Sequence, residues 1–134
     1  MMVAYSFKKQ FAEPILAGTK RQTIRAERKR HARPGEAVQL YTAMRTRHCK
    51  QIGIAVCTSV LDIQIEVEAG VIREMDTGVE IRTAPDLDDF ARMDGFTDWQ
   101  VMAAFWRDNH PDTPIFSGVL IRWQDFRAAI QGEW

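Results

Sequence analysis

The sequence predicts a small α+β domain, built as a small, partly open β-barrel with two or three short helices on its flanks. Apolar residues alternate with a period of two over most of the chain, whereas helical spacing occurs in only a few short segments. The 134 residues, 46% of them hydrophobic, suffice for one domain over residues 1–134 that buries its own core.

The predicted strands are short runs of alternating apolar residues separated by turn signals. They cover residues 3–7, 22–25, 37–43, 51–68, 69–83 and 115–123. The run 51–68 is long enough for one bent strand or two shorter ones, and the run 69–83 contains a turn at 76–78. Strands therefore outnumber helices, as in small barrels.

A first short helix is predicted to follow the N-terminal strand. Ser6 is a candidate N-cap, and Phe11 and Ile15 have the spacing of a buried helical face. Pro14 limits the length of this helix. Gly18 is well placed to end it in the left-handed conformation.

Two more helices are predicted between residues 84 and 110. Leu87 and Phe90 have helical spacing, and Asp94 followed by glycine ends the first of the two. For the second, Thr97 with a glutamine three residues later predicts a capping box, and Val101 is expected to pack on the preceding phenylalanine.

Charge is distributed unevenly along a chain whose formal net charge is zero. Residues 1–50 contain twelve Lys or Arg and three Asp or Glu, a formal charge of +9, and residues 51–134 carry −9. Seven of these cations lie between positions 20 and 33. Such clustering is typical of proteins that bind a phosphate-bearing partner. Pairing of the two halves in the fold is the alternative interpretation.

The sequence lacks the common motifs for nucleotide triphosphates, dinucleotides, serine hydrolases and zinc proteases. We expect no metal and no cofactor, because His48, Cys49 and Cys57 do not have the spacing of a zinc site. No apolar run reaches about 18 residues, and the N-terminus lacks the charge order of a signal peptide. A cytoplasmic protein with no membrane partner is therefore expected, and the oligomeric state stays open.

Four segments together resemble the ASCH domain, a relative of the PUA fold. They are ILAGTKRQTIR at 15–25, RPGEAVQLYTAMRTRHCKQIG at 33–53, ARMDGFTDWQVMAAFW at 91–106 and FSGVLIRW at 116–123. The resemblance extends from about Val3 to Trp123, and GTKxxTIR is its most specific part. It implies a PUA-like β-barrel with flanking helices and a cleft beside it, in a superfamily associated with RNA and modified nucleosides.

Some small bacterial members of that family are amidohydrolases that act on N(4)-acetylcytidine. The resemblance implies Lys20 and Thr23 as catalytic residues, and it aligns Asp94 with the catalytic glutamate of that family. Aspartate is one methylene shorter, so its carboxylate must come from a closer backbone or act through water. The remaining candidate site residues, for substrate binding, are Arg25, Arg28 and Tyr41.

The chemistry requires Lys20 to be neutral if it is to activate the weakly acidic hydroxyl of Thr23. Lowering the pKa of a lysine from about 10.4 to about 7 costs roughly 4 to 5 kcal/mol. Neighbouring arginines lower this pKa, whereas an ionised Asp94 raises it, so Lys20 must also be buried.

Strand geometry sets a second condition on Lys20. Residues three apart in one strand point to opposite faces, so Lys20 and Thr23 converge only if Lys20 lies in a turn before the strand. Gly18 makes such a turn possible. Thr23 and Arg25, two apart, share a face.

Two functions stay open at this point. The first is hydrolysis of an acylated cytidine-type nucleoside, with Thr23 as nucleophile, Lys20 as base and Asp94 as the orienting group. The second is RNA binding without catalysis, in which the basic segment 20–33 binds phosphates and Tyr41 stacks on an unpaired base. RNA cleavage is a variant of the second function, although no pair of histidines is obviously placed for it. The candidate partners are accordingly a small nucleoside and RNA.

Overall fold

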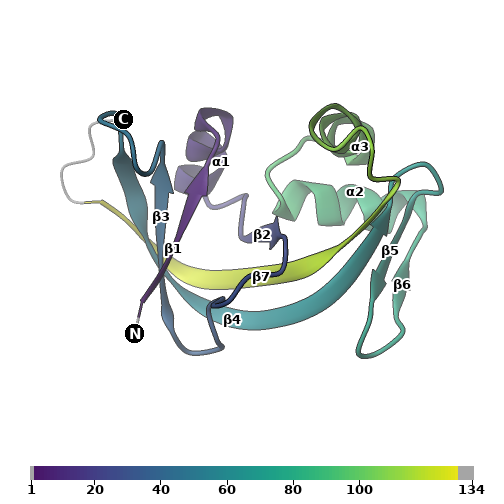
Figure 1. Ribbon diagram of the computed structural model, residues 1–134, viewed down its shortest axis with the longest axis horizontal. Helices are drawn as coiled ribbons and strands as arrows, with labels where there is room; N and C mark the ends of the chain where they lie inside the picture. Colours follow the sequence, from purple (N-terminus) through teal and green to yellow (C-terminus); the bar gives the residue numbers. More distant parts are fainter. Residues whose placement is uncertain (1, 130–134) are drawn as a thin grey trace.

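The computed structural model describes residues 2–129, which form an α+β fold on one strongly bent sheet of seven strands (Figure 1). The strands are β1 (Val3–Phe7), β2 (Gln22–Arg25), β3 (Ala37–Thr42), β4 (Lys50–Glu66), β5 (Val71–Glu74), β6 (Glu80–Ile81) and β7 (Ile115–Ala128). The strand order is β1-β3-β4-β5-β6, and β7 pairs with both β4 and β2. The pair β1 and β3 is parallel, and the other pairs are antiparallel.

The two longest strands, β4 and β7, determine the shape of the sheet. They pair over most of their length and follow the same arc across the molecule (Figure 1). Their register shifts between Ile54 and Val56 and again between Cys57 and Ser59, and such bulges bend a strand. None of the strand pairings within residues 2–129 closes the sheet. The predicted α+β class is therefore confirmed, and the predicted partly open barrel is a curved sheet that stays open.

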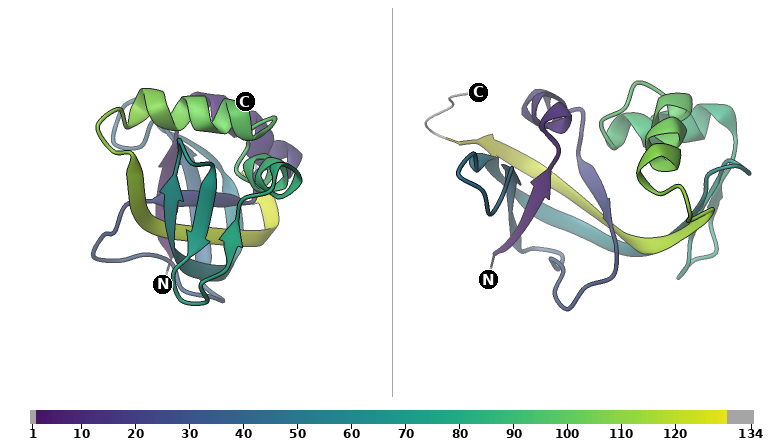
Figure 2. Two further views of the ribbon diagram at one scale, coloured as in Figure 1. Left: turned by 90° about the vertical axis from the view of Figure 1, so that its right-hand side faces the viewer. Right: turned by 45° about the horizontal axis from the view of Figure 1, so that its top comes forward.

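Three α-helices lie on the concave side of the described sheet (Figure 1). They are α1 (Ala12–Ala17), which follows the 3-10 turn η1 (Lys9–Phe11), α2 (Ala84–Met93) and α3 (Trp99–Asn109). Figure 2 shows α2 and α3 at the end of the molecule that carries β5 and β6. None of the helices within residues 2–129 is both long and apolar enough to cross a membrane.

The core fills the space between the helices and the bent sheet. Alternate residues of the strands point into it, as Val38 and Leu40 of β3 do, and both are fully buried. From the helices come Leu87, Phe90 and Met102, also buried. Burial of this continuous apolar cluster is the main favourable contribution to folding.

Two predicted helix caps are wrong. Ser6 lies in β1, which pairs with β3 through its last residue, and the Ser6 hydroxyl accepts a hydrogen bond from the Met44 N–H. The N-cap of α3 is Asp98, whose carboxylate accepts a hydrogen bond from the Val101 N–H at 3.0 Å. Aspartate caps as well as threonine does and adds a favourable charge at the helix N-terminus. With this start, Val101 faces solvent and is 47% exposed.

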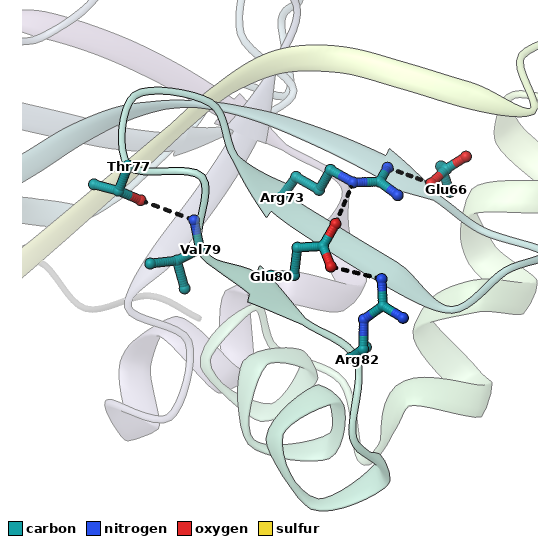
Figure 3. A network of polar contacts seen from close by, with 6 residues as sticks. All are labelled: Glu66, Arg73, Thr77, Val79, Glu80 and Arg82. Carbon is teal, nitrogen blue, oxygen red and sulfur yellow. Dashed lines mark hydrogen bonds and ion pairs between the residues drawn. The ribbon is translucent and has the colours of Figure 1, made fainter.

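A surface network joins the three strands at one end of the sheet (Figure 3). Arg73 on β5 contacts the carboxylates of Glu66 on β4 and Glu80 on β6, and Arg82 pairs with Glu80 at 2.6 Å. Thr77 closes the turn before β6 by accepting a hydrogen bond from a main-chain N–H. All of these residues lie in the acidic part of the sequence, residues 51–134. Arginines of this part therefore neutralise some of its carboxylates.

Candidate active site

Lys20 reaches the interior because α1 ends immediately before it. Gly18 adopts the predicted left-handed conformation, with φ of 84°. The N–H groups of Thr19 and Lys20 both donate to the Pro14 carbonyl at 3.1 Å, and the Arg21 N–H donates to the Met93 carbonyl at 2.8 Å. This turn is fixed on both sides, and it directs the Lys20 side chain inward, where the residue is only 3% exposed.

Strand β2 places Thr23 and Arg25 on one face. Thr23 is 4% exposed, and its Oγ1 accepts a hydrogen bond from Nε of Arg25 at 2.9 Å. The Arg25 guanidinium also donates to the Ser6 carbonyl at 2.8 Å and lies over the ring of Phe7. Arg25 therefore bridges β2 and β1, two strands with no pairing to each other among the described residues.

Asp94 is the C-terminal cap of α2 and is 5% exposed. Its main-chain oxygen accepts a hydrogen bond from Nζ of Lys20 at 2.6 Å, and its Oδ2 lies 3.9 Å from the same nitrogen. The other carboxylate oxygen accepts from Nε2 of Gln22 at 3.1 Å. Gln22 in turn accepts from Nε of Arg122 at 3.2 Å, so a chain of hydrogen bonds across β2 and β7 orients the carboxylate.

Burial dominates the electrostatics of this cluster. It lowers the pKa of Lys20 from 10.5 to about 8, with Arg25 adding to the decrease and Asp94 opposing it. Burial likewise raises the pKa of Asp94, against the effects of Lys20 and Gln22. Burial lowers the pKa of Arg25 to about 10. At pH 7 Lys20 is therefore mostly charged, with roughly a tenth of the molecules holding the neutral amine.

Lys20, Thr23, Arg25 and Asp94 line one cleft of about 340 Å³. Its walls are rich in aromatic rings, which come from β1, η1, the α2–α3 connection, α3 with its C-cap, and β7. These rings are Phe7, Phe11, Phe96, Phe105, Trp106, His110 and Phe116. Volumes of this size are typical of small-molecule sites. Polar groups with shifted pKa values thus lie on one side of an otherwise apolar cavity, an arrangement that favours proton transfer at a bound small molecule.

Tyr41 and Arg28 do not line this cleft. Leu40 points into the core, so the alternation of β3 turns Tyr41 to the opposite face of the sheet. Arg28 lies outside the cleft, over the ring of Tyr5, and donates to the Arg30 carbonyl. Arg30 itself pairs with Glu36 at 2.6 Å. The predicted basic segment is therefore divided between buried site residues, internal pairs and exposed cations.

Sequence reasoning missed Gln22 and His110. Gln22 could have been recognised in the sequence as a polar residue inside a predicted strand. Its side chain is fully buried and makes hydrogen bonds to Asp94 and Arg122. His110, the C-cap of α3, stacks on Trp106 with ring centroids 4.4 Å apart. Its Nδ1 is buried and has no hydrogen-bond partner among residues 2–129.

Within the part of the chain that the structure describes, no group of three or more His, Cys, Asp or Glu side chains is arranged to hold a metal ion. The polar residues that line the cleft include Lys20, Thr23, Arg25 and Asp94.

No protein-family model matches the chain, and no curated protein sequence does. Among solved structures, ASCH from Zymomonas mobilis is similar over 93% of this chain and 68% of that chain, with 16% identity and a TM-score of 0.55. Two of its point mutants, one Tyr to Phe and one Ser to Ala, match with 15% identity, a TM-score of 0.55 and coverage of 70% and 68% of their chains. The chain therefore has the fold of ASCH-domain proteins, which is PUA-like.

Proposed function

We propose that this protein is an amidohydrolase that removes an acyl group from the exocyclic amine of cytidine-type nucleosides. The observation that carries the proposal is the convergence of Lys20, Thr23 and Asp94 in one cleft, with the pKa of Lys20 lowered to about 8. At pH 7 a lysine with this pKa is neutral in roughly a tenth of the molecules, against well under a thousandth for an exposed lysine. It is then available as a general base.

The reaction begins with transfer of the Thr23 hydroxyl proton to the neutral amine of Lys20. The Thr23 oxygen attacks the acyl carbonyl carbon, and the bond from this carbon to the exocyclic nitrogen breaks. The Lys20 ammonium returns its proton to the departing amine, which leaves cytidine and an acylated Thr23. Water then attacks the carbonyl carbon of this ester and gives a proton to Lys20. The bond from this carbon to the Thr23 oxygen breaks, Lys20 passes the proton to that oxygen, and the carboxylic acid leaves. Thr23 and Lys20 return to their starting states.

Arg25 supports the first step through its hydrogen bond to Thr23. Its Nε–H already donates to Oγ1 at 2.9 Å, so the guanidinium favours negative charge on that oxygen and leaves the hydroxyl hydrogen free for a base. The bond from Arg25 to the Ser6 carbonyl and its position over Phe7 fix the guanidinium before substrate enters. Such preorganisation is what makes a donor effective in catalysis.

The aromatic walls suit a flat, uncharged base. Phe11 and Phe105 lie edge to face, with centroids 5.5 Å apart, and Trp106 packs against Phe116 at 4.7 Å. These rings offer the apolar surface on which a pyrimidine stacks. In this arrangement the acyl group points to Thr23 and Lys20.

RNA binding is the second candidate function. It is favoured by the exposed cations Arg21, Lys29 and Arg33, which flank the cleft residues in the sequence. Exposed cations that track a phosphate backbone give affinity without sequence preference. RNA cleavage is a variant of this candidate, for which the cleft offers a single histidine, His110.

The test of the proposed function is incubation of the pure protein with N(4)-acetylcytidine, followed by chromatographic detection of cytidine and acetate. We expect both products in equal amounts, with formation that depends on protein concentration. Substrates with longer acyl groups, assayed in parallel, define the acyl preference. No cytidine from any acylated cytidine, together with salt-sensitive binding of single-stranded RNA, would reject the enzyme in favour of the RNA-binding candidate.

A further inference from the structure

A second cleft, of about 890 Å³, adjoins the candidate active site. It lies between the end of β1 with the start of η1 and the connection from β3 to β4. Ser6, Phe7 and Lys8 line both clefts, so the two share a wall at the end of β1. The two clefts are therefore direct neighbours, separated by these three residues.

The second cleft is lined by positive charge. The cations are Lys8, Lys9 and Lys50, all exposed lining residues. His48, from the β3–β4 connection, lies on the same lining. No Asp or Glu is among the described residues that line it. A concave surface whose charges have one sign strengthens the local electrostatic potential. Lysine ammonium groups bind phosphate oxygens as point charges. The hydroxyls of Ser6 and Thr42 lie on the same lining and add neutral hydrogen-bonding groups.

The connection that carries His48 is held in a defined conformation. Ala43 and Arg45 both have positive φ, 53° and 66°, which costs on the order of 1 kcal/mol for each non-glycine residue. The hydroxyl of Thr46 donates to the Ala43 carbonyl at 2.8 Å and accepts from the His48 N–H at 3.1 Å. These bonds fix the backbone of the loop that carries His48 beside the cleft.

We propose that the second cleft binds a phosphate group of the substrate, so that the preferred substrate is an acylated cytidine nucleotide and not the free nucleoside. This inference rests on the proposed function, which places the acylated base in the first cleft. The phosphate belongs either to a free mononucleotide or to a nucleotide within RNA. Both sources present the same chemistry, an anionic phosphate ester on the ribose, to the same lysines.

Binding tests the phosphate site independently of hydrolysis. Isothermal titration calorimetry at low salt compares cytidine with cytidine 5′-monophosphate and cytidine 3′-monophosphate. We expect at least one monophosphate to bind about tenfold more tightly than cytidine, the effect of one charge-assisted hydrogen bond. A double variant, Lys9→Gln with Lys50→Gln, should remove this difference, while the control Arg82→Gln, which removes an exposed cation that lines neither cleft, should keep it. Equal affinities of the wild-type protein for cytidine and both monophosphates would overturn the proposal.

Turnover then distinguishes the two sources of phosphate. The substrates are N(4)-acetylcytidine, its 5′- and 3′-monophosphates and a short oligonucleotide with one N(4)-acetylcytidine. A higher kcat/KM for a monophosphate than for the nucleoside supports the mononucleotide source, and a still higher value for the oligonucleotide supports RNA. Hydrolysis of all four with equal kcat/KM would overturn the phosphate site and leave the proposed function intact. Tight binding of a monophosphate without hydrolysis of any of the four would reject the proposed function and keep the site.

Discussion

The Nζ of Lys20 lies 2.6 Å from the main-chain oxygen of Asp94 and 3.9 Å from the carboxylate Oδ2 of the same residue. The main chain of Asp94 therefore makes the short contact that positions the amine. The carboxylate influences the charge of the amine from a greater distance, and Gln22 holds that carboxylate in place. Position and charge of Lys20 can thus be changed separately by substitution.

Asp94→Asn is expected to keep the position of the Lys20 amine and to lower its pKa, because the Asp94 carboxylate raises it. Activity that needs neutral Lys20 increases with pH and levels off above its pKa, near pH 8 in the wild-type protein. In the variant the same rise should occur at lower pH. The measurement is kcat/KM for an acylated cytidine as a function of pH. A rise at the same or higher pH in the variant would contradict this electrostatic role.

Lys20→Met should change how stability depends on pH. The pKa of Lys20 is about 8 in the folded protein and near 10.5 in the unfolded chain. Below pH 8 both states bind the proton, and the penalty for burying the charge is complete. Between pH 8 and 10.5 the unfolded chain binds more protons, so the stability of the wild-type protein rises with pH relative to Lys20→Met. Urea denaturation at pH 7 and 10 should show a relative gain of roughly 2 to 3 kcal/mol. A constant difference between the two proteins would contradict the lowered pKa.

Gly95→Ala should displace Lys20. Gly95 has φ of 96°, and a Cβ at this position would lie 2.9 Å from Cδ of Lys20. We expect a loss of stability of about 1 to 2 kcal/mol from the backbone and a larger proportional loss of activity. Gly35→Ala is the matched control, because its φ is 90° and a Cβ there meets open space. Gly35→Ala should lose a similar amount of stability but keep the wild-type activity. If Gly95→Ala were as active as Gly35→Ala, Lys20 would tolerate the displacement.

The basic segment is tested by replacing Arg28, Lys29 and Arg30 together with alanine. If three or four phosphate contacts bind single-stranded RNA, log affinity should fall against log salt with a slope of about −2 to −3, and the triple variant should flatten it by roughly two. These residues lie outside the first cleft, so turnover of the free nucleoside should stay within a few fold. An RNA affinity that the variant leaves unchanged would exclude this segment as an RNA site.

Alternation and turn chemistry were sufficient to predict the strands and the end of α1 at Gly18. They could not predict which strands pair, because the contacts of β7 with β2 and β4 join residues far apart in the sequence. The proximity of Lys20 and Asp94 has the same long-range origin, and it was suggested only by the resemblance to a family. That Tyr41 points away from the core was predictable, because Leu40, the residue before it in the strand, points into the core. The aromatic walls and the unpartnered nitrogen of His110 depend on how α3 packs, which no local pattern specifies.

The central claim is that Lys20 and Thr23 act together on an acylated cytidine. Its most direct test compares deacylation of N(4)-acetylcytidine by Thr23→Val and Lys20→Met with that by Thr58→Val and Lys29→Met, which change an exposed threonine and an exposed lysine outside the cleft. The first two variants should each lose more than about a hundredfold in kcat, with far-ultraviolet circular dichroism like that of the wild-type protein, and the two controls should stay within about twofold. Retention of more than about a tenth of the wild-type turnover by either Thr23→Val or Lys20→Met, a loss of under roughly 1.4 kcal/mol of transition-state stabilisation, would contradict the account.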